Sequence, residues 1–120
     1  MELRELLEKN IKIIEHYGVK AQIPVWIEEM SELTKALCKW SRIYNKLEGD
    51  IDSNLLNSLK EEIADVIVCI DQLRYMIQYD EQELMEQYKN KVERQLKRIE
   101  GEEWERLQWF YQLWGSEWLF

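Results

Sequence analysis

Apolar residues recur every three or four positions along most of the chain, which is the spacing that places them on one face of an α-helix. The first such segment covers residues 2–17 and ends at Gly18, a residue type that often closes helices. The second covers residues 24–47 and opens with Pro24, which suits a first helical turn because the N–H that it lacks is not needed there. Residues 19–23 are therefore expected to form a short connection.

The third helix is expected over residues 53–79, after a loop over residues 47–53, and its apolar arc is wide enough to predict burial on more than one side. A fourth helix is expected to begin at Asp80, because this N-cap residue is followed three positions later by Glu83. The apolar stripes that define the second and third helices are Met30, Leu33, Leu37, Trp40, Tyr44 and Leu47, then Leu56, Leu59, Ile63, Val66, Ile70, Leu73 and Ile77.

The chain changes character at Gly101, where we expect the fourth helix to end or to kink. Residues 102–120 contain half of the chain's aromatic residues and keep helical spacing in part, so an extra short Trp-rich C-terminal helix is expected there. Because so much aromatic surface is seldom left in water, this tail is expected to pack within the chain or on a second copy, with covering a substrate as the alternative. The expected division is a helical domain over residues 1–100 and an aromatic extension over residues 101–120.

Composition supports an all-α fold, because the 120 residues include one proline and four glycines and lack the alternation of strands. No apolar run is long enough for a transmembrane helix, and the N-terminus does not have the pattern of a signal peptide. The net charge of −8, without a basic stripe, argues against a nucleic-acid polymer as partner. Cys38 and Cys69 fall within helices, which favours buried thiols in a reducing cytosol over a disulfide. We therefore expect a cytoplasmic helical protein without a membrane partner.

Two acidic pairs stand out, Glu29 with Glu32 on the second helix and Glu62 with Asp65 on the third. In each pair the spacing of three residues places both carboxylates on one face, at the edge of the apolar stripe. They are either solvated surface charges or ligands that converge on a divalent cation. A surface carboxylate on a helix is usually paired with a lysine at position i+4. Each of these acidic residues instead has an apolar residue at position i+4. The pattern favours a cation, and oxygen ligands suit Mg²⁺, with Mn²⁺ as a substitute.

A basic cluster on the fourth helix contains Lys89, Asn90, Lys91 and Arg94. Magnesium sites built on carboxylates usually leave positions for substrate phosphates, and basic side chains on a further helix can hold such phosphates. The residues alone therefore predict metal-dependent chemistry on a phosphorylated small molecule.

The motif Glu29-x-x-Glu32, followed one helix later by Glu62-x-x-Asp65, resembles the signature of the MazG-like all-α NTP pyrophosphatases. The Lys-Asn-Lys segment at residues 89–91 is similar to part of the family's last core helix. The resemblance covers roughly residues 24–99 and does not include the aromatic tail. It implies that the domain is an all-α four-helix bundle completed by oligomerisation, as a homo-dimer or a homo-tetramer.

The resemblance also implies an activity, the Mg²⁺-dependent hydrolysis of a nucleoside or deoxynucleoside triphosphate between the α and β phosphates. In members of the family specific for deoxycytidine triphosphate, the aromatic residue after the first motif lies one position before Trp40, at Lys39 here. The implied site residues are Glu29, Glu32, Glu62 and Asp65 for the metal, Glu28 or Glu61 for orienting the attacking water, Lys89, Asn90, Lys91 and Arg94 for the phosphates, sugar or base, and Trp26 and Trp40 for stacking on the base.

Two other functions remain open at this point. A phosphoribosyl-ATP pyrophosphohydrolase shares the general fold. A protein of a different class, a helical interaction module, would keep its acidic faces solvated and bind a partner through its Trp-rich tail.

Overall fold

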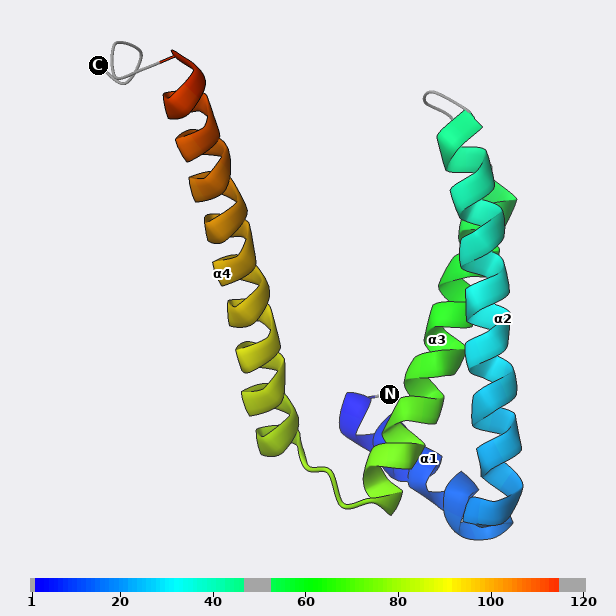
Figure 1. Cartoon of the computed structure of the whole chain (residues 1–120). Coiled ribbons are helices and arrows are strands. Elements are labelled where there is room, and N and C mark those ends of the chain that lie inside the picture. The colour runs from blue at the N-terminus through cyan, green and yellow to red at the C-terminus, as the bar shows by residue number, and fades with distance from the viewer. Residues whose placement is uncertain (1, 47–52, 115–120) are drawn as a thin grey trace. The chain divides into compact units, whose positions relative to one another are not determined.

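The computed structural model describes residues 2–46 and 53–114, and in these ranges it contains α-helices and no strand. The helices are α1 (Leu3–Tyr17), α2 (Val19–Lys46), α3 (Ser53–Met76) and α4 (Glu81–Trp114) (Figure 1). The prediction of an all-α chain with four helices is therefore confirmed. Most of the loop expected over residues 47–53 and the end of the aromatic tail lie outside the described residues.

The turn between α1 and α2 consists of Gly18 alone, so the predicted connection over residues 19–23 is wrong. Gly18 has a φ of 83°, a value that a glycine adopts easily, and its N–H donates to the carbonyl of Ile14 over 2.8 Å. Because this one residue reverses the chain, α2 begins directly at Val19. Pro24 consequently lies inside α2 and not in its first turn. At this position its missing N–H removes one backbone hydrogen bond of the helix.

Helices α2 and α3 run antiparallel and lie side by side (Figure 1). Many of their buried and half-buried residues recur in steps of three and four, which defines one continuous interface along each helix. The interface includes Gln22, Trp26, Glu29, Leu33, Ala36, Trp40 and Ile43 on α2 and Leu55, Leu59, Glu62, Val66, Cys69 and Leu73 on α3.

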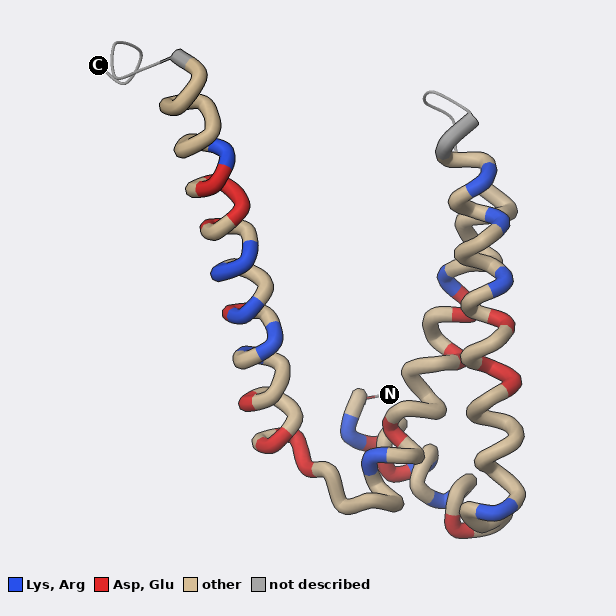
Figure 2. Tube along the Cα trace, viewed as in Figure 1, with Lys and Arg blue, Asp and Glu red and all other residues tan. Residues whose placement is uncertain are grey.

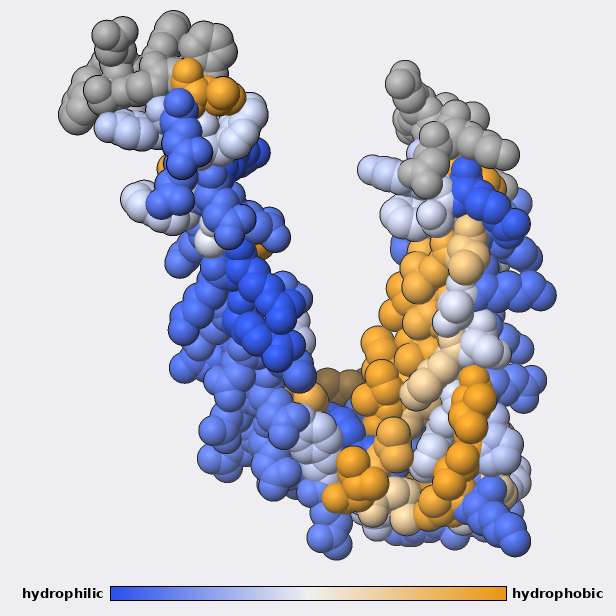
Figure 3. Space-filling view, viewed as in Figure 1, coloured by the Kyte–Doolittle hydropathy of each residue, from blue (hydrophilic) through white to orange (hydrophobic). Residues whose placement is uncertain are grey.

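This interface lies about one residue around each helix from the predicted stripe. Each helix carries two adjacent stripes, and the one that packs is not the one that was predicted. Met30 and Leu37 on α2 and Ile63 and Ile70 on α3 were expected in the core and are 40–45% exposed. Periodicity identifies both stripes as apolar but does not tell which one packs inside the chain. The exposed stripe forms an apolar face on the α2/α3 hairpin (Figure 3).

A polar network joins α1, α2 and α3 beside the small core formed by Ile14, Trp26 and Cys69. The side-chain oxygen of Gln72 accepts hydrogen bonds from Trp26 Nε1 over 2.8 Å and from Gln22 Nε2 over 3.1 Å. The amide nitrogen of Gln72 donates to Asn10 Oδ1 over 2.8 Å. Because each bond has a fixed direction, this network sets how the three helices align along their axes.

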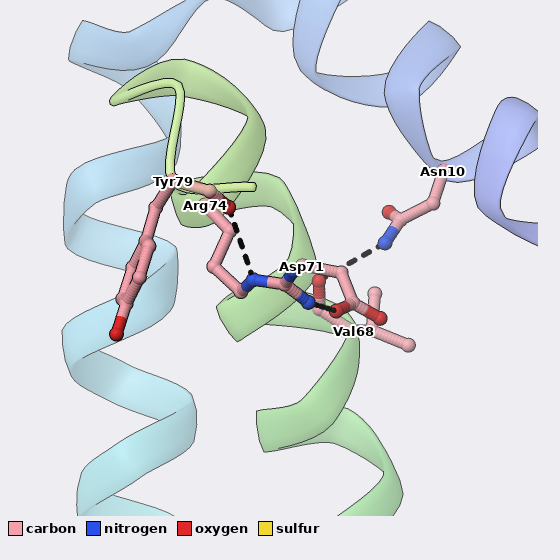
Figure 4. Close-up of polar contacts among 5 residues, drawn as sticks. All are labelled: Asn10, Val68, Asp71, Arg74 and Tyr79. Atoms are coloured by element: carbon pink, nitrogen blue, oxygen red, sulfur yellow. Dashed lines mark hydrogen bonds and ion pairs between the residues drawn. The ribbon is translucent and has the colours of Figure 1, made fainter. Parts of the chain in front are cut away.

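The end of α3 is also tied to α1 and to the segment that follows it (Figure 4). Asn10 Nδ2 donates to the carbonyl of Val68 over 3.0 Å. Arg74 donates from Nε to the carbonyl of Tyr79 over 3.3 Å and pairs with Asp71 over 3.4 Å. These contacts close the first compact unit of the chain, Met1–Tyr79.

The second compact unit comprises Asp80–Phe120 and contains α4. Asp80 Oδ1 accepts a hydrogen bond from the backbone N–H of Glu83 over 2.8 Å, which confirms the predicted cap. Of the two outcomes expected at Gly101, an end of the helix is wrong, because α4 continues to Trp114. The residues from 102 to 114 therefore belong to α4 and do not form a separate C-terminal helix. A glycine inside a helix costs only about 1 kcal/mol relative to alanine, which good helix formers on both sides can offset. The domain boundary expected after residue 100 stays a prediction.

In neither unit, as far as the described ranges reach, is any helix long and apolar enough to span a bilayer.

Candidate functional site

Three carboxylates meet at the middle of the α2/α3 hairpin. Glu29 and Glu62 occupy interface positions on α2 and α3, and Glu32 lies one turn after Glu29. One oxygen from each of the three carboxylates lies within 4.8 Å of the other two. Figure 2 shows acidic segments at matching levels on the two helices. The structure therefore brings together three of the four predicted metal ligands.

The surroundings of these carboxylates limit how they can be solvated. Glu29 and Glu62 are half-buried, whereas Glu32 is exposed. Oε2 of Glu29 and Oε2 of Glu62 are both buried and have no hydrogen-bond partner among the described residues. A buried carboxylate oxygen without a partner is costly unless the group is protonated or meets a cation.

The electrostatics of the cluster are consistent with this cost. Burial raises the pKa of the Glu29 carboxyl above its usual range, and the negative charges of Asp65 and Glu32 raise it further. Burial also raises the pKa of Glu62, and the charges of Glu32 and Asp65 add to the effect. Each residue is only half-buried, but one oxygen of each carboxylate is enclosed. We therefore attribute the larger part of the rise in pKa to desolvation of that oxygen.

The other predicted acidic residues border the cluster. Asp65 is exposed and is not among the three closest carboxylates, but its charge contributes to the raised pKa of Glu29. Glu28 and Glu61 are exposed as well, each next to one of the enclosed carboxylates. Glu28 raises the pKa of Glu29 and Glu61 raises that of Glu62, so both charges act on the cluster.

This donor set fits a hard divalent cation. All candidate ligands are carboxylate oxygens, the kind of ligand that Mg²⁺ and Mn²⁺ take in proteins. Glu29, Glu32 and Glu62 offer three of them at short mutual distances, and the two enclosed oxygens have no competing donor in the described chain. Asp65 does not belong to this group of three, but its charge acts on both Glu29 and Glu62.

The predicted phosphate-binding residues lie on α4, in the second unit. Gln87, Asn90, Lys91 and Arg94 line a shallow depression, because their spacing places them on one helix face. Lys89 lies outside this depression and pairs with Glu93 over 3.9 Å, with both side chains largely exposed. The structure therefore groups three of the four predicted residues on one face of α4.

The two tryptophans predicted to stack on a base have different surroundings. Trp26 is 4% exposed and belongs to the core, where its indole N–H is hydrogen-bonded to Gln72. Trp40 is half-buried and stacks on Tyr44, with ring centroids 4.9 Å apart and an interplanar angle of 27°. Its buried Nε1 has no hydrogen-bond partner within the described ranges. We assign Trp26 to the core and keep Trp40 as the candidate for contact with a base.

Sequence reasoning missed the amide network next to this site. Gln22 and Gln72 are both buried, and Trp26, which donates a hydrogen bond to Gln72, lies one turn before Glu29 on α2. A polar residue at a core spacing, such as Gln72 three positions after Cys69, is the signal that could have indicated it. The network is a positioning element, because it fixes the alignment of the helices that carry the carboxylates.

No protein-family model, curated protein or solved structure matches this chain. The candidate site therefore rests on the geometry and chemistry of its own residues.

Proposed function

We propose that this protein is a Mg²⁺-dependent hydrolase that cleaves a nucleoside or deoxynucleoside triphosphate between the α and β phosphates, releasing a monophosphate and pyrophosphate. The observation that carries the proposal is the convergence of Glu29, Glu32 and Glu62 from two antiparallel helices, with two enclosed oxygens that have no partner among the described residues. The resemblance of the two acidic motifs to the MazG-like pyrophosphatases supports the choice of reaction.

The carboxylates of this chain have two separate roles in the proposal. Glu29, Glu32, Glu62 and Asp65 hold the cation, for which Mn²⁺ can substitute. A divalent cation at such a site supplies Lewis-acid polarisation of a phosphoryl oxygen and neutralises charge that develops in the transition state. Glu28 and Glu61 lie next to the ligands and remain exposed, so we assign them to accepting a hydrogen bond from the attacking water and orienting it.

The proposal also keeps the predicted substrate contacts, each on its own helix. Asn90, Lys91 and Arg94 share one depression on α4 and are assigned to the phosphates and the sugar, with Lys89 at its edge. Trp40 lies two turns beyond Glu32 on α2, roughly 12 Å along the helix axis, and is assigned to the base. The exposed apolar face of the hairpin supports a bundle that is completed by further helices, in a homo-dimer or a homo-tetramer.

The test is a panel of nucleoside and deoxynucleoside triphosphates with and without Mg²⁺, in which pyrophosphate and inorganic phosphate are measured separately. We expect pyrophosphate release that requires the cation and falls at least about 100-fold in Glu62→Gln, since a ligand is lost while the size of the side chain is kept. Glu5→Gln, on the exposed face of α1, is the matched control and should keep full activity. Full activity in Glu62→Gln would remove the metal assignment.

A second function is favoured by the aromatic surface of α4. Trp104, Leu107 and Tyr111 line an open groove with two glutamines, and all three residues are at least 47% exposed. A helical interaction module would use this surface and show no turnover of any nucleotide. A phosphoribosyl-ATP pyrophosphohydrolase would instead release pyrophosphate from that substrate alone, so phosphoribosyl-ATP is included in the panel.

A further inference from the structure

Helix α4 carries an apolar stripe with a repeat of eleven residues. The positions of Met85 and Tyr88 recur as Leu96 and Ile99, and again as Leu107 and Phe110. Eleven residues are only slightly more than three full turns, so the repeat forms a nearly straight line along the helix. The six side chains are 40–64% exposed. Such a long apolar stripe requires a partner surface of similar length.

The charges along α4 change sign along this stripe. Residues 87–98 contain five basic residues and one acidic residue, and residues 99–106 contain four acidic residues and one basic residue. Glu103 interrupts the stripe at the position equivalent to Val92, one repeat earlier. In a parallel pair of α4 helices, like charges would face each other and Glu103 would meet its own copy. An antiparallel pair places the basic segment of one helix along the acidic segment of the other.

We propose that α4 pairs with α4 of a second copy of this chain in an antiparallel orientation. If Leu96 faces Ile99 of the second copy, the same alignment places Tyr88 against Leu107 and Met85 against Phe110. In each pair the two residues are equally far along α4 from the two-fold axis.

The alignment also accounts for the charged residues. Glu103 faces Val92 of the second copy, one turn from that copy's Lys89, so a cation is within reach of its carboxylate. The opposite charges of the two segments favour the antiparallel orientation, although exposed pairs of opposite charge add little affinity by themselves.

Length, apolar spacing and charge together favour a second α4 as the occupant of the stripe. Helix α4 has 34 residues, whereas α2 has 28 and α3 has 24. At 1.5 Å per residue, α4 extends roughly 50 Å, and the stripe covers most of that length. Another α4 matches it in length, in apolar spacing and in charge. Asn90 and Arg94 lie on the opposite, hydrophilic face, so the pairing leaves the depression on that face accessible and does not depend on the proposed activity.

The first test is the mass of the full chain in solution by light scattering. We expect a dimer, or a multiple of one, whose dissociation constant rises at least about 100-fold in the double variant Leu96→Gln/Ile99→Gln, as expected when two apolar side chains per copy lose their contacts. Glu105→Gln lies away from the stripe on an exposed face and is the matched control. Circular dichroism should show the same helix content in all three proteins at high concentration.

The second test measures orientation by spin labels at single cysteines in a Cys38→Ser background, since Cys69 is buried and out of reach of the reagent. Labels at Glu83 or at Gln112 should be separated from the same label in the other copy by more than roughly 40 Å, because each site is more than four turns from the midpoint. Short distances at both sites would show a parallel pair and overturn the proposal. A monomeric wild type, or an unchanged dimer in Leu96→Gln/Ile99→Gln, would also overturn it.

Discussion

The amide network around Gln72 offers the sharpest test of how α1, α2 and α3 are held together. Gln72→Leu keeps the approximate volume of the side chain and removes its oxygen and its nitrogen together. Trp26 and Gln22 then lose the acceptor for their N–H groups, and both residues are at least 93% buried. Asn10, the third partner, is only half-buried and can turn to water. The substitution therefore leaves two buried donors without an acceptor.

The magnitude follows from these two donors. A buried donor without a partner costs about 1–3 kcal/mol, so the pair costs about 2–6 kcal/mol. Burying the added apolar surface of leucine returns about 1 kcal/mol. We therefore expect Gln72→Leu to lower the free energy of unfolding by about 1–5 kcal/mol, a large share of the 5–15 kcal/mol that is typical of a domain.

The assay is urea unfolding followed by circular dichroism at one fixed protein concentration, because association shifts the apparent stability. Gln82→Leu makes the same chemical change at an exposed position on α4 and serves as the control. Trp26→Phe removes one donor, so the double variant Trp26→Phe/Gln72→Leu should be more stable than the sum of the single effects predicts, by at least about 1 kcal/mol. A loss below about 0.5 kcal/mol in Gln72→Leu, with no coupling to Trp26, would refute the network.

Two further predictions concern the carboxylates and the C-terminal part of α4. The pKa values of Glu29 and Glu62 are raised in the folded state, so folding takes up protons at these two groups. The stability that these groups contribute is fully present below their unfolded pKa and is lost as the pH rises through their folded pKa. In the presence of a chelator, Glu29→Gln should therefore be more stable than wild type at neutral pH and lose this advantage at acid pH; a lower melting temperature than that of Glu5→Gln at neutral pH would contradict the electrostatic argument. Truncation after Ile99 should reduce the oligomer size or the solubility while Mg²⁺ still raises the melting temperature, and an unchanged mass and solubility would refute the role of the aromatic segment.

The sequence predicts the helices well and their packing less well, for a physical reason. A helical period shows which residues share a face, and each of the four helices coincides with a long periodic segment of the sequence. The extra turn of α2 before Pro24 was missed because one glycine with a left-handed φ suffices to reverse the chain. The continuation of α4 through Gly101 was missed because a single glycine weakens a helix without ending it.

The choice between adjacent stripes is where sequence reasoning fails and where the candidate site lies. The stripe that packs between α2 and α3 contains Gln22, Glu29, Glu62 and Gln72, whereas the more apolar stripe with Ile63 and Ile70 is exposed. A chain selected for stability alone would bury the apolar stripe. Placing carboxylates in the interface costs stability unless a cation compensates, and leaving isoleucines exposed costs solubility unless another surface covers them. These two costs are the reasons for proposing a cation at the interface and a second surface over the apolar face.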